Sequence, residues 1–227
     1  MSHIYRNTVF LVRHGENPAN ITKEFSSILV DYSLTDKGVL QAHQTGLFFR
    51  DKHIDEIYAS PLKRARETAS IIGYELGLPI TVMEEFREIG VGDLERRPPT
   101  VENWRIHDQV LQDWYTGKFE SRFPEGENLF MVADRLRRGL KQMTLGKQNK
   151  RIILVGHGGL FMVAALAICH QSLGQEHLAG NHNCSVTELD LETTEEEVSG
   201  TLRCWAAYGH LSGLAAQVIS GSFQYDE

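Results

Sequence analysis

The stretch VFLVRHGENPAN, from Val9 to Asn20, runs from four apolar residues directly into an arginine and a histidine. A second stretch, RIILVGHGGL from Arg151 to Leu160, repeats the pattern, with an apolar run that ends at His157 between glycines. Neither run alternates polar with apolar side chains, as a strand with one solvent-exposed face would, so each predicts a fully buried strand. Both histidines are therefore expected at the carboxyl ends of buried strands.

Predicted strands alternate with predicted helices around these two stretches. Further strands are expected in IDEIYASP (54–61), PITVMEEF (79–86), CSVTELDL (184–191) and LRCWAAY (202–208), and helices in LTDKGVLQAHQTGLFFRDK (34–52), SPLKRARETASIIGYELGL (60–78) and LFMVAALAICH (160–170). The alternation predicts an α/β fold, a three-layer α/β/α sandwich with a mostly parallel central sheet. Ligands of such sheets bind outside the carboxyl ends of the strands, so the two histidines are expected to face one pocket.

Local signals predict the ends of two of these helices. Thr35 or Asp36 suits the N-cap of the first helix, which carries an apolar series at helical spacing made of Leu40, His43, Leu47 and Phe48. Ser60 and Pro61 suit the N-cap and the first position of the second helix, and Gly77 suits its end.

The segment from about residue 90 to residue 126 interrupts the alternation. It contains RRPPT, then Trp104, His107, Trp114 and Tyr115 on a predicted helix, then FPEGEN. We expect this segment to form an inserted, partly helical lid over the edge of the sheet, within a single domain of residues 1–227.

Charge and cysteine content exclude several classes of protein. The 227 residues include 23 Lys and Arg against 30 Asp and Glu, a net charge of −7, whereas a nucleic-acid or anionic-membrane binder needs a basic face. Three cysteines without metal-type spacing indicate reduced thiols and a cytoplasmic location. No run approaches the roughly 20 apolar residues of a membrane span, and the N-terminal run is too short for a signal peptide.

The ten histidines do not carry equal weight. A single histidine is more often a surface or hydrogen-bonded structural residue than a catalyst, and we assign His43, His53, His107 and His177 to that group. The two strand-end histidines differ, because they occupy equivalent positions and one of them has an arginine beside it.

Six segments that contain these features follow one another in a characteristic order. They are LVRHGE with Asn20 six residues beyond His14, LTDKGVLQA, ASPLKRARETA, FREIGVGDLE, FPEGEN and VGHGG. In this order they resemble the histidine phosphatase superfamily, also called the phosphoglycerate mutase-like family. The end of the chain, WAAYGHLSG, is similar to that family's closing strand and turn. The resemblance covers nearly the whole chain.

The resemblance implies phosphoryl transfer through a phosphohistidine. His14 would be the nucleophile, because a neutral imidazole attacks phosphorus and its phosphoramidate is labile enough to hydrolyse. His157 and Asn20 would donate hydrogen bonds to the transferring oxygens. The glycine after His157, Gly158, would let the backbone approach the phosphate closely.

Two arginines suit the charge of a phosphoryl group, which needs forked cationic donors around its oxygens. They are Arg13, next to His14, and Arg64 in the first turn of a predicted helix whose N-terminus itself favours an anion. Both would stabilise charge during catalysis. Lys63 and Arg66 are expected on the surface.

The leaving alkoxide needs a proton, and the family pattern places the acid at Glu88. This carboxyl group must hold its proton when it is needed, which we expect burial or the nearby phosphate to favour. Glu16 is expected to orient its neighbours, and Glu16 and Asp93 are the next candidates for the acid.

No cofactor or metal is needed, because arginines and histidines supply the charge. A zinc site made of His14, His157 and Glu88 is the competing interpretation, but arginines beside neutral histidines repel a cation. A catalytically silent phosphate- or phosphoprotein-binding module is another alternative, although such a module would not need a nucleophile and an acid together.

Departures from the family pattern bear on the substrate. Many members have Ser-x-Trp before the asparagine, where this chain has NPAN, and the run of basic residues by which cofactor-dependent mutases hold a bisphosphate is absent after Glu88. These differences favour a phosphatase acting on a small phosphomonoester over a phosphoglycerate mutase. The sequence leaves open the roles of Arg96, Arg97, Trp104 and Trp114, and whether the apolar segment GLAAQVI (213–219) forms a homodimer.

Overall fold

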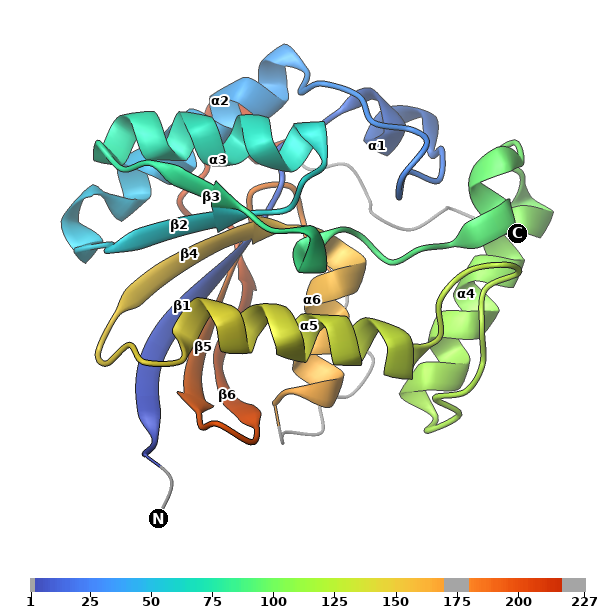
Figure 1. Ribbon diagram of the computed structural model, residues 1–227. Coiled ribbons are helices and arrows are strands. Elements are labelled where there is room, and N and C mark those ends of the chain that lie inside the picture. Colours follow the sequence, from blue (N-terminus) through green and yellow to red (C-terminus); the bar gives the residue numbers. More distant parts are fainter. Residues whose placement is uncertain (1–2, 170–179, 218–227) are drawn as a thin grey trace.

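The structure, a computed structural model, describes residues 3–169 and 180–217. Its centre is a six-stranded sheet in the order β3-β2-β4-β1-β5-β6 (Figure 1). Four strands are mutually parallel, namely β1 (Tyr5–Arg13), β2 (Glu56–Ala59), β3 (Ile80–Val82) and β4 (Arg151–Gly156). The strand β5 (Val186–Thr193) pairs antiparallel with both β1 and β6 (Val198–Ala207). The predicted α/β fold with a mostly parallel sheet is confirmed.

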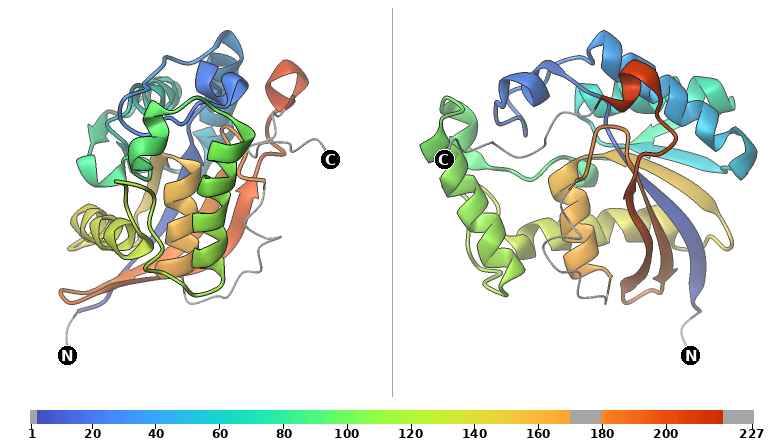
Figure 2. Two further views of the ribbon diagram at one scale, coloured as in Figure 1. Left: turned by 90° about the vertical axis from the view of Figure 1, so that its right-hand side faces the viewer. Right: turned by 180° about the vertical axis from the view of Figure 1, so that it is seen from behind.

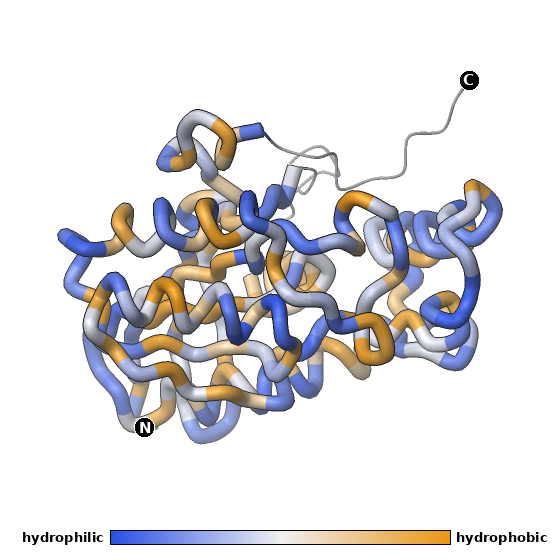
Figure 3. Tube along the Cα trace, turned by 90° about the horizontal axis from the view of Figure 1, so that it is seen from above, coloured by the Kyte–Doolittle hydropathy of each residue, from blue (hydrophilic) through white to orange (hydrophobic). Residues whose placement is uncertain are grey.

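Helices cover both faces of this sheet. Figure 1 shows α2 (Asp36–Phe49) and α3 (Lys63–Leu76) on one side, and α5 (Leu129–Thr144) and α6 (Gly158–Ala167) on the other; Figure 2 shows the same layers from two further directions. In Figure 3 hydrophobic and hydrophilic residues alternate along the outer helices, as in helices with one buried face. No helix of the described residues has both the length and the apolar content to cross a membrane.

Side chains of β1 are buried on both faces and join two separate cores. Val9 and Leu11 pack with the cluster under α5 and α6, whereas Phe10 and Val12 pack with the cluster under α2 and α3. Successive strand residues point to opposite faces, so an unbroken apolar run is what a strand between two helical layers requires. The three-layer sandwich thus follows from the absence of alternation in the sequence.

The helix α2 has the predicted N-cap but buries a different face. The Thr35 hydroxyl accepts the Gly38 N–H at 3.1 Å, whereas Leu47 and Phe48 of the predicted apolar series are 47% and 38% exposed. The buried face is made mostly of small or polar residues, and a Cβ on Gly46 would lie 2.8 Å from the Glu75 side chain. Close packing of α2 on α3 therefore buries the small-residue face and leaves Leu47 and Phe48 exposed.

The helix α3 begins two residues later than predicted. Its N-cap is Leu62 rather than Ser60, and the first residue is Lys63 rather than Pro61. Both carboxylate oxygens of Asp31 accept the Lys63 N–H, at 2.8 and 2.9 Å. A carboxylate from a distant loop therefore caps this helix, while Gly77 ends it with a φ of 67°, as predicted.

Several shorter elements lie on the side to which the strand arrowheads of β2 and β3 point (Figure 1). They are α1 (Pro18–Thr22), α4 (Val101–Tyr115) and the 3-10 turns η2 (Glu84–Phe86), η3 (Gly92–Arg96) and η4 (Gly213–Ala216), whereas the turn η1 (Arg50–Lys52) lies at the opposite end, before β2 begins. The two ends of the 90–126 segment are tied together, because Asp93 N–H donates to Pro124 O at 2.8 Å and Glu127 N–H donates to Gly90 O at 2.7 Å. That this segment works as a lid stays a prediction.

Candidate active site

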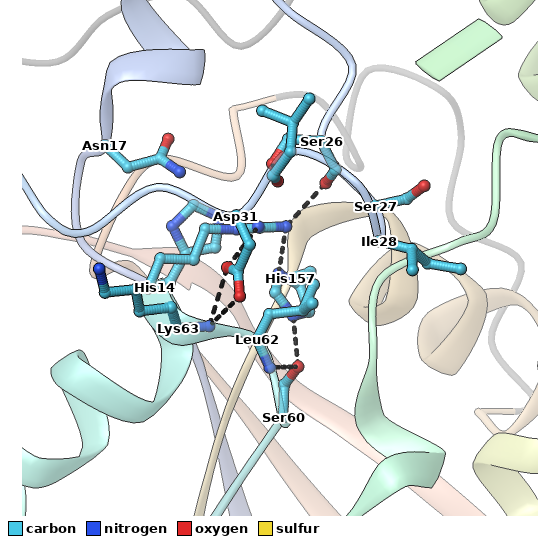
Figure 4. Close-up of polar contacts among 12 residues, drawn as sticks. His14, Asn17, Ser26, Ser27, Ile28, Asp31, Ser60, Leu62, Lys63 and His157 are labelled. Carbon is cyan, nitrogen blue, oxygen red and sulfur yellow. Dashed lines mark hydrogen bonds and ion pairs between the residues drawn. The ribbon is translucent and has the colours of Figure 1, made fainter. Parts of the chain in front are cut away.

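The two strand-end histidines meet between β1 and β4. These strands are neighbours, and their register pairs Arg13 with Gly156, the residues directly before His14 and His157. The imidazole centroids lie 5.3 Å apart, and the two side chains are 3% and 0% exposed. Figure 4 shows both rings among side chains of the 26–31 loop and the start of α3. The two imidazoles therefore lie side by side, but only His14 lines the cavity, and His157 is buried beside it.

The hydrogen bonds of His14 leave its Nε2 atom with a lone pair. Its Nδ1 lies 2.8 Å from Gly15 O, and because a carbonyl can only accept, Nδ1 carries the proton. Burial first, then the guanidinium groups of Arg64 and Arg13, lower the pKa of His14 well below its ordinary value. The ring is therefore neutral near pH 7, with Nε2 free to act as a nucleophile.

His157 holds the opposite tautomer. Arg64 Nη2 donates to its Nδ1 at 3.2 Å, so the proton is on Nε2, which donates to Ser60 Oγ at 2.6 Å. Burial, Arg64 and His14 lower the pKa of His157 well below its ordinary value. Both ring nitrogens are engaged, so this imidazole is fixed in orientation.

Three buried N–H donors beside the histidines make no hydrogen bond to the residues that the structure describes. They are Arg13 Nε, Asn17 Nδ2 and Arg64 Nη1, although Arg64 Nη1 lies 3.7 Å from Asp31 Oδ1. Buried polar groups are ordinarily paired, so a cluster of unpaired donors indicates an anionic or carbonyl-type ligand. Burial lowers the pKa of Arg13 to about 10, so the guanidinium stays charged at neutral pH.

The loop between α1 and α2 holds the guanidinium group of Arg64 in place. Ser26 O accepts Arg64 Nη2 at 2.8 Å, and Glu95 fastens the rest of the loop by accepting a series of backbone N–H groups, from Ser27, Ile28 and Leu29 at 2.7 Å each and from Val30 at 3.0 Å. Burial raises the pKa of Glu95, but these donors outweigh burial and lower it overall. The arginine is thus held by a loop whose backbone N–H groups the half-buried Glu95 carboxylate binds.

Glu88 lies at the N-terminus of α6. Its carboxylate accepts the N–H groups of Ile89 at 2.9 Å, Leu160 at 3.0 Å and Gly159 at 3.3 Å. A Cβ on Gly159 would come within 2.8 Å of Glu88 Oε1, so only glycine permits this approach. Burial lowers the pKa of both Arg13 and Arg64, and the charge of Glu88 opposes that effect at both guanidinium groups.

A buried ion pair holds the backbone of Glu88. Arg135 Nη2 donates to Glu88 O at 3.0 Å, and Nη1 donates to the carbonyls of Glu85 and Arg87 at 2.9 and 2.8 Å. Its remaining donors reach the Glu127 carboxylate, at 2.9 Å for both contacts, and Glu127 Oε2 accepts Gly90 N–H at 2.7 Å. The segment carrying Glu88 is therefore fixed at several successive peptides.

Asn20 and Asn17 cap each other at the start of α1. Asn17 N–H donates to Asn20 Oδ1 at 3.0 Å, Asn20 N–H donates to Asn17 Oδ1 at 3.2 Å, and Asn183 Nδ2 donates to Asn20 Oδ1 at 3.0 Å. These bonds engage the oxygen of each amide and orient the NH₂ groups as the remaining donors. Asn17 is thus a second uncharged donor, which the sequence did not single out.

A cavity of about 740 Å³ lies beside these groups. Arg13, His14, Arg64 and Glu88 form its polar end, together with the asparagines and Gly158. The rest of the wall comes from the 19–27 segment, from α4 and from residues 180–183.

A sequence model of the histidine phosphatase superfamily (branch 1) matches residues 9–201 of the chain. The chain belongs to the histidine phosphatase superfamily. It is 32% identical over 197 residues to the probable phosphoglycerate mutase GpmB of Erwinia tasmaniensis, covering 85% of this chain and 88% of the relative. It is 32% identical over 205 residues to the uncharacterized phosphatase PhoE of Bacillus subtilis, covering 90% and 97%. The solved structure of Bacillus stearothermophilus YhfR shares the fold, with a TM-score of 0.72 at 23% identity over 90% of this chain and 98% of the other.

The resemblance inferred from the motifs is confirmed, and the protein is a histidine phosphatase superfamily enzyme. Several residues that its sequence suggested lie outside the site. Glu16 pairs with Lys37 at 2.7 Å and accepts the Thr35 hydroxyl at 2.9 Å, so it ties the end of β1 to α2. Asp93 forms an exposed pair with Arg97 at 2.7 Å, and neither lines the cavity.

Other residues of this superfamily member were assigned differently by the sequence, or their roles were left open. His107, assigned to the surface or structural group, lines the cavity, as does Trp104, whereas Trp114 is 1% exposed and belongs to the core. Arg96 is exposed, as are Lys63 and Arg66. His177 lies outside the described residues.

The competing zinc site finds no support in the described part of the chain. No group of three His, Cys, Asp or Glu side chains in residues 3–169 and 180–217 could hold a metal ion. The Glu88 carboxylate instead faces backbone N–H groups. That the reaction needs no metal or cofactor stays a prediction.

Proposed function

We propose that this enzyme is a phosphomonoester hydrolase that acts through a phosphohistidine at Nε2 of His14. The observation that carries the proposal is the neutral, Nδ1-protonated imidazole beside the buried Arg64 and the partly buried Arg13, because it combines a ready nucleophile with cationic donors for a phosphoryl group. The roles below concern His14, Arg13, Arg64 and Glu88, while His157 orients Arg64 by accepting a hydrogen bond from its Nη2 at 3.2 Å.

In the first step the Nε2 lone pair of His14 forms a bond to phosphorus, and the bond from phosphorus to the leaving oxygen breaks. Arg13 Nε and Arg64 Nη1, which lack partners within the described chain, donate to the phosphoryl oxygens. Glu88 transfers a proton to the leaving oxygen, so an alcohol departs rather than an alkoxide. The incoming phosphate dianion beside Glu88 favours the protonated carboxyl group.

In the second step water hydrolyses the phosphohistidine. The Glu88 carboxylate takes a proton from the water as its oxygen bonds to phosphorus. The P–N bond breaks, its electron pair returns to Nε2, and inorganic phosphate leaves. The hydrogen bond from His14 Nδ1 to Gly15 O, at 2.8 Å, holds the ring in the same tautomer through both steps.

A mutase of the phosphoglycerate type is the second candidate, and the charges of the cavity favour hydrolysis. Beyond Arg13 and Arg64, the described lining residues include one lysine, Lys23, and three carboxylates, Glu24, Glu88 and Asp108. A mutase must hold an anionic intermediate while the phosphoryl group moves between its oxygens, and this wall offers it little positive charge. A silent binding module is disfavoured because nucleophile and candidate acid occur together.

Rapid quenching with a ³²P-labelled phosphomonoester tests the proposal. Acid-labile, base-stable label is expected on His14, located by peptide mapping, and inorganic phosphate is expected as the product. Dialysis against EDTA should leave this turnover intact. Product that consists of an isomerised phosphoester would establish the mutase instead, and absence of both label and product would leave a binding module.

Cytoplasmic location and dimerisation stay predictions. Leu214 in the segment suggested for dimerisation is 53% exposed, and residues 218–219 lie outside the described residues.

A further inference from the structure

The cavity has an apolar wall opposite its phosphate-binding end. We define the apolar wall as Phe25, Trp104, Leu111, Tyr115 and Phe123, all of which line the cavity. Trp104, Leu111 and Tyr115 fall on one face of α4 at intervals of seven and four residues. The cavity volume of about 740 Å³ lies in the range of pockets that enclose drug-sized ligands, so the space extends well beyond a phosphate group.

Contacts among the aromatic rings hold this wall in one arrangement. The ring of Phe25 lies 4.6 Å from Trp104 and 5.6 Å from His107, and His107 lies 5.5 Å from Phe123, measured between centroids. Trp104 Nε1 donates to Lys23 O at 3.0 Å, which fixes the indole plane across two segments 81 residues apart. A surface of this kind binds aromatic and apolar groups without first having to be ordered.

The charged groups near the wall are one lysine, Lys23, and two carboxylates, Glu24 and Asp108, so acids outnumber the cation there among the described residues. Burial raises the pKa of Tyr115 to about 12, so its phenol is neutral. Asp108 follows His107 on α4 and lies 2.9 Å from its ring nitrogen, which places a carboxylate on the same helix face. A leaving group that carried its own carboxylate would meet an apolar surface flanked by acids.

We propose that the apolar wall binds the leaving-group part of the substrate, and that this part is an uncharged aromatic or apolar alcohol. The proposal rests on the phosphatase function proposed above and specifies its substrate class. Phosphoglycerates and other short carboxylate-bearing phosphates are disfavoured by the same surface.

Phosphonates that the enzyme cannot hydrolyse measure binding to the wall independently of turnover. Benzylphosphonate is expected to bind about 10- to 100-fold more tightly than methylphosphonate, since burial of a phenyl-sized group is worth that factor. Phosphonoacetate, which carries a carboxylate instead of the ring, is expected to bind no more tightly than methylphosphonate. Benzyl phosphate should exceed ethyl phosphate in kcat/KM by a similar factor, and both release primary alcohols.

Substitutions at Leu111 test where the ring binds. Leu111→Ala should reduce the benzyl-to-methyl affinity ratio several-fold, and Leu111→Lys should reduce it further while it improves phosphonoacetate binding. Leu214→Ala, the same change at a residue outside the cavity, should leave the ratio unchanged. Circular dichroism and inorganic phosphate binding confirm that each variant is folded with an intact phosphate site.

The outcomes separate this proposal from the phosphatase proposal. Equal affinities for benzyl- and methylphosphonate, in an enzyme that still forms the phosphohistidine and releases phosphate, would overturn the substrate class alone. The proposed substrate class would also be overturned if benzylphosphonate bound more tightly than methylphosphonate by the same factor in Leu111→Ala and Leu111→Lys as in the unchanged enzyme. If neither phosphonate nor inorganic phosphate binds and no phosphohistidine forms, both proposals fail.

Discussion

His14 and His157 follow equivalent strands, yet their neighbours give them opposite tautomers. His14 donates from Nδ1 to the carbonyl of the adjacent Gly15, at 2.8 Å, and keeps the Nε2 lone pair. His157 accepts at Nδ1 from Arg64, at 3.2 Å, and donates from Nε2 to Ser60, at 2.6 Å. The position after a buried strand thus brings an imidazole to the site, and the hydrogen-bond partners decide whether it can attack or only orient.

The origin of these partners explains the difference. The acceptor for His14 is the next residue, so it comes with the strand end itself. The partners of His157 come from β2 and α3, which lie 97 and 93 residues away in sequence. The tautomer of His14 is therefore determined by the local backbone, and the tautomer of His157 by tertiary packing.

The largest expected effect tests this division directly. His14→Ala should lower kcat/KM by about 10⁴-fold or more and abolish the phosphoenzyme, because the nucleophile itself is lost. His157→Ala should lower kcat/KM by about 10- to 100-fold, because it removes the acceptor that orients Arg64 Nη2 and the donor to Ser60, and should still form the phosphoenzyme. Both rates are measured by phosphate release, with trapping of label as the second readout. If His157→Ala abolishes label while His14→Ala retains it, the assignment is reversed.

The next effect concerns Glu88 and depends on the leaving group. Glu88→Gln removes the transferable proton, so kcat/KM for an alkyl phosphate should fall by about 10²- to 10⁴-fold. For p-nitrophenyl phosphate the fall should be much smaller, because the phenolate leaves without a proton. Glu84→Gln, an exposed neighbour, is the matched control. Equal losses on both substrates would assign Glu88 to water activation or to structure.

The sequence predicted the strand ends well because that information is local. An unbroken apolar run followed by Arg13, His14 and Gly15 specifies a buried strand and what stands at its end. The start of α3 was predicted wrongly for an equally physical reason: the Ser60 hydroxyl accepts the Leu62 N–H and the His157 Nε2–H, while Asp31, 32 residues away in sequence, accepts the Lys63 N–H at the first helical residue. A cap that comes from a distant loop leaves no trace in the local sequence.

Residues that support the site were missed for the same reason. Glu95 binds the 27–30 loop across about 65 to 68 residues, and Arg135 reaches the backbone of Glu88 across 47. Both are ordinary surface-type residues in their local sequence, and only the fold buries their charges. Asn17 carried a weak signal, since it lies in the NPAN segment that departs from the family pattern.

A smaller effect is expected from the hydroxyl group that orients His157. Ser60→Ala removes the acceptor of the Nε2 proton, which should lower kcat/KM by about tenfold, the worth of one buried hydrogen bond. The loss should be similar for alkyl and aryl phosphates, unlike that of Glu88→Gln. Ser70→Ala, on the exposed side of α3, is the control. A nitrogen-15 spectrum in which His157 keeps its tautomer, with unchanged kcat/KM, would contradict a positioning role for Ser60.

The smallest expected effect is on the pH dependence of stability, and it should be the same for the two histidines. Burial, followed by Arg64 as the next cause for each, lowers the pKa of both well below the unfolded value near 6.5. As the pH falls toward that value, both imidazoles bind protons in the unfolded chain but stay neutral in the folded chain. The free energy of unfolding therefore falls as the pH falls. Between pH 7 and pH 6 the loss should be about 0.7 kcal/mol for each histidine. Urea unfolding at the two pH values measures it, and His14→Gln and His157→Gln should each reduce the loss by the same amount, despite their unequal effects on catalysis. If His14→Gln leaves the pH dependence unchanged, folded His14 takes up a proton in this range, and its lone pair is not available as the proposed mechanism requires.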